Sequence, residues 1–184
     1  MAKAASRQKA PIDLGRALIQ AFMTNERVNQ VLIELIAPQI WRAFPPSSKR
    51  RNIATSFAHI HNVRCMRLTM SARGSKVPAR LDRSEVTPGQ AAKALADSAD
   101  AMARLIRVSL DAGGRVQAFP PDVVLMVCLA ITHEAHHRGQ ICHWARELGS
   151  PIPRERTPEL WDWPRLSRGV WPRLPRAESD RRRL

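Results

Sequence analysis

Four long stretches in which apolar residues recur about every 3.6 positions restrict this chain to a helical fold. They cover residues 12–37, about 47–72, 87–113 and 120–149. Such spacing places apolar side chains on one face of an α-helix. No segment shows the sustained alternation of apolar and polar residues that is typical of strands. We therefore expect an all-α protein.

Punctuating residues predict where these helices begin and end. Ser47 and Ser48 are suited to cap the second helix, and "TPGQ" at residues 87–90 combines a Thr cap, an early Pro and a reciprocal Gln. Gly149 is a typical helix end. Four long helices with modest connections predict an antiparallel four-helix bundle over residues 12–149.

The two ends of the chain differ from this helical region. Residues 1–11 are expected to form a flexible basic N-terminus. Residues 150–184 form a C-terminal extension rich in Pro, Trp and Arg. Since Trp is costly to leave in water, we expect this extension to pack on the bundle or on a partner through about Trp163 and to be disordered from Ala177 onward.

Composition limits the cellular setting and the class of partner. The 184 residues suit one domain, and a hydrophobic content of 44% indicates a globular chain. The net charge of +14 favours an anionic partner such as nucleic acid, an acidic ligand or a membrane surface, or else a solvated basic surface. Cys65, Cys128 and Cys142 form no C-x-x-C motif and are interpreted as buried thiols. With no apolar leader and no run long enough to span a bilayer, we expect a cytoplasmic protein.

Histidines in two helices suggest a metal site. In "THEAHHRGQI" at residues 132–141, His133 and His137 are four positions apart, so a helix places both on one face within reach of one divalent ion. "FAHIHNVR" offers His59 or His61 as a third ligand. These two point in nearly opposite directions, and periodicity does not choose between them. Three histidines with an open fourth position are typical of a catalytic site.

The same segment also matches H-E-x-x-H, in which Glu134 would be the general base of a zinc peptidase. Glu155 or Glu159 could then supply the third ligand. Such peptidases present their substrate along a sheet edge, and this chain predicts no sheet. We therefore treat the peptidase as the weaker alternative. If the chain is not a peptidase, Glu134 faces solvent or pairs with Arg138.

Taken together, these motifs resemble those of the DinB-like proteins. "THEAHHRGQI" resembles their helix-four motif and "FAHIHNVR" their helix-two motif, while "MTNERVNQVLIE" and "ELWDW" resemble further segments in the same order. The resemblance implies a four-helix bundle holding one divalent ion on three histidines, which here are His59, His133 and His137. His136 would be a neighbour of the site, and Thr132 stands where the family usually has Asn.

The resemblance also implies relatives that are metal-dependent transferases and isomerases and use thiols such as mycothiol, bacillithiol or glutathione. Our first hypothesis for this chain is a metal-dependent transferase or hydrolase of the DinB-like kind. We expect Zn or Ni at the site, with Fe or Mn as alternatives, and a small anionic substrate. Arg64 and Arg138 are candidates to bind that substrate, or else Arg64 is exposed and Arg138 pairs along its helix. Asn25 and Asn29 point either into the pocket or to solvent.

A nucleic-acid-binding protein and a non-catalytic interaction module are the alternative functions, and a homodimer is the expected assembly.

Overall fold

The computed structural model describes residues 11–71, 76–117 and 122–168, and within these ranges the chain is helical without any strand. This confirms the all-α expectation. The elements are four long helices, one short helix and two 3-10 turns: α1 Leu14–Leu35, η1 Pro38–Ile40, α2 Ile53–Ser71, α3 Pro88–Asp111, α4 Val123–Glu147, η2 Thr157–Leu160 and α5 Trp163–Ser167.

The helix starts follow from side chains that satisfy free backbone N–H groups. The predicted capping box forms at α3, where Thr87 accepts from the Gln90 backbone and the Gln90 side chain accepts from Thr87. The Asp122 side chain caps α4 in the same way by accepting from the Leu125 backbone N–H. After α4 the chain turns at Gly149, whose φ of +72° favours glycine.

The start of α2 differs from the sequence prediction. The residue that caps α2 is Asn52, whose side-chain oxygen accepts from the Thr55 backbone N–H at 2.9 Å. Ser48 accepts from the Arg51 backbone N–H at 3.1 Å, within the preceding turn. The helix therefore begins later than Ser47 and Ser48 suggested, and Arg51 lies outside it.

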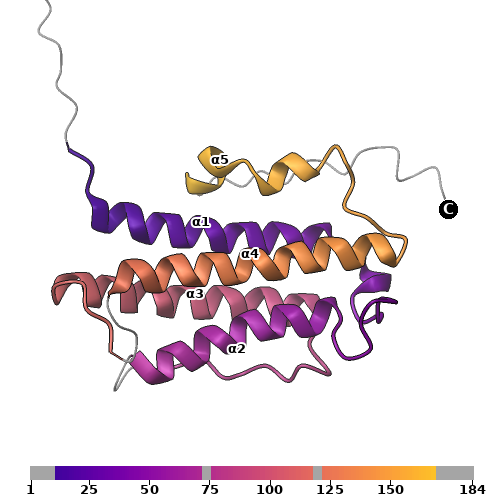
Figure 1. Ribbon diagram of the computed structural model, residues 1–184, viewed down its shortest axis with the longest axis horizontal. Helices are drawn as coiled ribbons and strands as arrows, with labels where there is room; N and C mark the ends of the chain where they lie inside the picture. The colour runs from indigo at the N-terminus through magenta and orange to yellow at the C-terminus, as the bar shows by residue number, and fades with distance from the viewer. Residues whose placement is uncertain (1–10, 72–75, 118–121, 169–184) are drawn as a thin grey trace, which may run out of the picture.

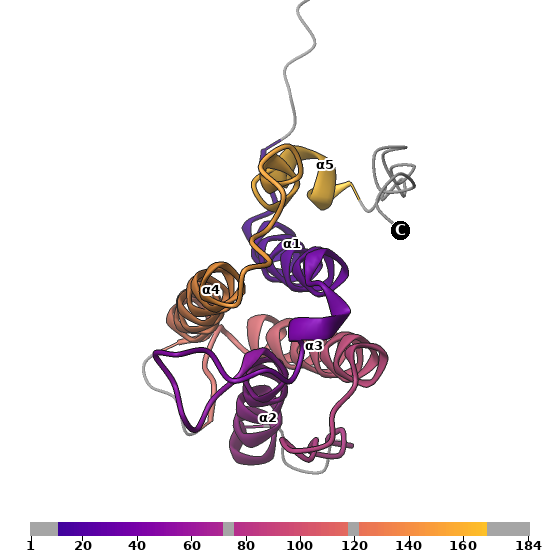
Figure 2. The same ribbon diagram turned by 90° about the vertical axis from the view of Figure 1, so that its right-hand side faces the viewer.

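The four long helices lie side by side around two apolar clusters (Figures 1 and 2). One cluster joins the C-terminal parts of α1 and α4 to the N-terminal parts of α2 and α3. The other joins the opposite ends of the same helices. Hence α1 and α4 run in one direction, and α2 and α3 run in the other. The consecutive helices α2 and α3 do not alternate in direction, because residues 76–87 return along the length of α2 (Figure 1).

The C-terminal extension packs along α1 (Figure 2). Leu166 is 1% exposed in a cluster with Val28, and its backbone oxygen accepts from Arg27 Nη1 at 2.6 Å. Trp163 borders that cluster, whereas Trp161 is 76% exposed and does not pack on the bundle, so packing on a partner stays a prediction for it. Of the N-terminal residues expected to be flexible, 1–11, residues 1–10 lie outside the described residues, as does the end expected to be disordered from residue 177.

All three cysteines are free thiols, but they are not all buried. Cys65 is buried and Cys142 half-buried, while Cys128 is exposed. The apolar pattern around Cys128 misled the prediction, because Leu125 and Leu129 beside it are exposed as well. In the described part of the chain, no helix has the length and apolar character needed to cross a membrane.

Candidate metal centre

The antiparallel pair α2 and α4 brings three histidines together. One nitrogen from each of His59, His133 and His137 lies within 4.8 Å of the other two. The ring centroids are 4.5 Å apart for His133 and His137, and 4.7 and 5.2 Å from His59 to His137 and His133. His137 is buried while the other two are half-buried. This three-histidine cluster could hold a metal ion and is open to solvent.

The structure separates the two histidines of α2. His61 is fully buried, and its Nε2 lies 2.8 Å from the Ala79 carbonyl oxygen and 3.3 Å from Cys65 Sγ. A rotation of about 200° over two positions turns His59 the opposite way, toward α4. The third member of the cluster is therefore His59.

Gln140 orients the ring of His137. The amide oxygen Oε1 of Gln140 lies 2.9 Å from His137 Nδ1. Because an amide oxygen only accepts, Nδ1 carries the proton and leaves the Nε2 lone pair free. That Nε2 lies 3.1 Å from His133 Nε2. Metal-binding histidines commonly donate a hydrogen bond from the N–H group of their second ring nitrogen to such a partner. Sequence reasoning missed Gln140, although its i,i+3 spacing from His137 indicates this contact.

Arg83 contacts the other side of the cluster. Its Nη2 donates to His59 Nδ1 at 2.7 Å. A neutral imidazole that binds a metal through Nε2 carries its proton on Nδ1 and cannot accept there. The Arg83 hydrogen bond and metal coordination therefore compete for His59. Arg83 comes from the connection between α2 and α3, and no sequence signal pointed to it.

Burial keeps these imidazoles neutral. Desolvation lowers the pKa of His59 to about 4, helped by the nearby charges of His137 and Arg83. Desolvation also lowers the pKa values of His133, where Glu134 opposes it, and of His137, where the Gln140 hydrogen bond opposes it. A neutral imidazole is the form that binds a metal ion. The electrostatics near neutral pH therefore suit metal binding.

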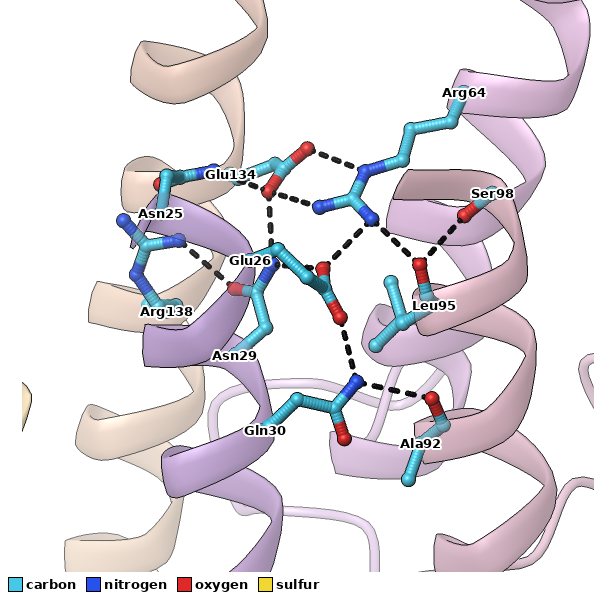
Figure 3. Close-up of polar contacts among 10 residues, drawn as sticks. All are labelled: Asn25, Glu26, Asn29, Gln30, Arg64, Ala92, Leu95, Ser98, Glu134 and Arg138. Carbon is cyan, nitrogen blue, oxygen red and sulfur yellow. Dashed lines mark hydrogen bonds and ion pairs between the residues drawn. The ribbon is translucent and has the colours of Figure 1, made fainter. Parts of the chain in front are cut away.

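Glu134, the residue between these histidines, lies in the core (Figure 3). Its oxygens Oε1 and Oε2 each lie 2.7 Å from Arg64, at Nε and Nη2 respectively. Asn25 and Asn29 also donate to Oε2, at 2.6 and 2.8 Å. Burial alone would raise the pKa of Glu134, but the charge and hydrogen bonds of Arg64, with that of Asn29, lower it. Glu134 is thus a fully paired, buried carboxylate.

Arg64 connects this carboxylate to α1 and α3. Its Nη1 lies 2.7 Å from Glu26 Oε2 and donates to the Leu95 carbonyl at 2.9 Å (Figure 3). Since Arg64 is only 1% exposed, it neither faces solvent nor has access to a ligand, contrary to both expectations. Arg138 Nη1 donates to Asn29 Oδ1 at 2.8 Å rather than pairing along α4. We call Glu26, Arg64 and Glu134, with Asn25, Asn29 and Arg138, the buried ion-pair network.

This geometry weakens the peptidase alternative. Glu134 is 1% exposed and its oxygens are held by donors, so it is not placed to activate a water. Of the two proposed downstream ligands, Glu159 pairs with Arg156 at 2.8 Å and Glu155 is exposed. The H-E-x-x-H match therefore supplies two members of the cluster without a general base.

A small cavity opens beside the three-histidine cluster. It has a volume of about 260 Å³, and two of the cluster's residues line it. The rest of its lining comes from the N-terminal part of α2 and from two connections. The lining residues are Arg50, Arg51, Thr55, Ser56, His59, Arg83 and His137. We call this the arginine pocket.

Comparison with known proteins gives one match. The model of the DinB family matches residues 107–164. The match supports a DinB-like assignment. The matched region holds α4, with His133 and His137, but not α2, so the place of His59 follows from the structure. No curated protein and no solved structure matches the chain.

Proposed function

We propose that this chain is a metal-dependent enzyme, a transferase or hydrolase, whose divalent ion is bound by His59, His133 and His137. In this proposal α1 to α4 form the four-helix bundle of the DinB-like kind around that ion. One observation carries the proposal, which is the convergence of three imidazole nitrogens from α2 and α4 within 4.8 Å.

The surroundings of the cluster favour a bound ion. The lowered pKa values keep the imidazoles neutral, and Gln140 directs the lone pair of His137 toward His133. Imidazole ligands suit Zn, Ni and Fe. We propose Zn or Ni, with Fe or Mn as alternatives. With three protein ligands, such an ion keeps an open position and supplies Lewis-acid chemistry.

The surrounding residues provide access for a substrate and support the helices that carry the cluster. The half-buried rings of His59 and His133 leave the cluster open to a small substrate, which we expect to be anionic. A low-molecular-weight thiol is a candidate cosubstrate by analogy with DinB-like proteins. We assign Glu134 to the buried ion-pair network, where it holds α4 against α1 and α2, in place of the general-base role.

Turnover tests this function. Protein loaded with Zn or Ni is assayed with glutathione, mycothiol or bacillithiol and an electrophilic acceptor, and separately with an activated ester. We expect metal-dependent turnover that falls in His133→Asn by more than the roughly 10–100-fold that follows loss of an outer-shell partner, because this variant loses a ligand. The matched control is His143→Asn, which changes an exposed histidine of the same helix and should retain activity. Full metal binding without turnover on any substrate would favour the non-catalytic interaction module.

A homodimer and a cytoplasmic location stay predictions from the sequence, and binding to nucleic acid stays an alternative. The first is tested by the oligomeric state in solution. The last is tested by the salt dependence of DNA binding, which should be steep if the charge of +14 contacts phosphates.

A further inference from the structure

The arginine pocket concentrates positive charge beside the three-histidine cluster. Arg50, Arg51 and Arg83 line it, and none of its lining residues carries a carboxylate. Arg50 and Arg51 precede Asn52, the cap of α2, whose first turn contributes Thr55. The partial positive charge of a helix N-terminus adds to the same field.

Nearby carboxylates do not neutralise these arginines. Asp82 accepts hydrogen bonds from the backbone and hydroxyl of Ser84, and Glu85 pairs with Arg42 at 3.3 Å. Within the described ranges, the structure contains no ion pair between a carboxylate and Arg50, Arg51 or Arg83. The pocket therefore has positive charge to offer an anion.

We propose that Arg50, Arg51 and Arg83 form a subsite for an oxyanion, a carboxylate or a phosphate, on the substrate of the neighbouring three-histidine cluster. This inference rests on the proposed function and specifies its substrate as a small molecule with an anionic group next to the reacting group. A guanidinium binds such oxyanions through two parallel hydrogen bonds. The volume of about 260 Å³ is just below the range of roughly 300–1,000 Å³ of drug-sized sites, which suits a small acid.

Arg83 couples the two sites. It donates to His59 Nδ1 at 2.7 Å, and this nitrogen cannot accept once Nε2 of the neutral ring is a ligand. Metal binding therefore releases the Arg83 side chain, which already lines the pocket, to an anion. We expect a metal ion to tighten anion binding, and by linkage an anion to tighten metal binding.

Calorimetric titration of the full chain with succinate tests the subsite. We expect succinate to bind wild-type protein, more tightly with Zn loaded than without, and neutral succinamide not to bind. In Arg50→Gln/Arg51→Gln the affinity for succinate should fall about tenfold or more, because two charged donors are lost. Arg83→Gln should lose the enhancement by Zn. Inorganic phosphate in a parallel titration shows which oxyanion the pocket prefers.

A matched control distinguishes binding by the pocket arginines from attraction by the net charge of the chain. Arg104→Gln/Arg107→Gln removes the same charge from exposed positions of α3 outside the pocket and should bind succinate within about twofold of wild type. The proposal is overturned if this control weakens binding as much as the pocket variant, or if the pocket variant binds like wild type. Metal content, measured on the same samples, reports separately on the three-histidine cluster. If that cluster binds no ion, titration of metal-free protein with succinate still measures the affinity of the arginine subsite.

Discussion

Arg64 carries a buried positive charge that depends on two partners. Its guanidinium lies 2.7 Å from both Glu26 and Glu134. Removing one partner of a buried pair leaves a charge that water cannot solvate. We therefore predict that Glu134→Gln lowers the free energy of unfolding by about 3 kcal/mol or more, measured by urea denaturation. Glu85→Gln, at an exposed pair with Arg42, should change it by less than about 0.5 kcal/mol.

The two variants also decide the role of Glu134. A residue that acted as an exposed general base would leave stability unchanged when it is replaced by Gln. A free energy of unfolding within error of wild type in Glu134→Gln would therefore contradict the buried ion-pair network.

The neutral histidines predict a pH dependence of stability. The pKa of His59 is about 4 in the folded protein against an ordinary value of 6.5. Between these values the unfolded chain binds more protons than the folded one, so stability falls as pH decreases from about 6.5 toward 4. His59→Gln should reduce this slope, measured by urea denaturation at a series of pH values. An unchanged slope in the variant would show that His59 does not contribute.

At the scale of elements, the capping box of α3 is the local feature that the sequence most fully specified. Thr87 and Gln90 satisfy each other's backbone N–H groups, as "TPGQ" predicted. Thr87→Ala should lower the free energy of unfolding by about 1 kcal/mol because one N–H loses its acceptor. Lys93→Ala, in the same helix with an exposed partner at Asp97, should change it by only a few tenths of a kcal/mol. Equal decreases in the free energy of unfolding in the two variants would contradict a specific stabilisation by the cap.

Local rules predicted the helices and part of the site, since capping and periodicity depend on neighbours within a few residues. The i,i+4 pair of His133 and His137 is of this kind. The choice between His59 and His61 is not, because both lie on helix faces with apolar neighbours, and the family resemblance was needed to favour His59. The buried position of Arg64 was also beyond prediction, since burial of a charge depends on partners far along the chain.

At the scale of the whole molecule, the relative direction of the helices was the feature that sequence did not supply. Residues 76–87 return along α2, so α2 and α3 are parallel (Figure 1). This return segment carries Arg83 to His59 and Ala79 to His61. Connections have no periodic pattern, so neither contact had a signal in the sequence.

Because the three-histidine cluster joins α2 to α4, metal binding should stabilise the whole fold. A ligand at 100 times its dissociation constant adds about 2.7 kcal/mol to the native state. For a chain of this size, this corresponds to a rise in Tm of roughly 5–10 °C with Zn or Ni, measured by calorimetry. His133→Ala should lose this rise. An equal rise in that variant would place the ion elsewhere in the molecule.

Elemental analysis of protein purified without an affinity tag or chelator tests the three-histidine cluster most directly. We predict about one equivalent of Zn, Ni, Fe or Mn per chain, lost in His133→Ala and retained in His143→Ala, whose histidine is exposed on the same helix. Less than about a tenth of an equivalent in wild type, unchanged by His133→Ala and not restored by added metal, would contradict a metal site at these three histidines.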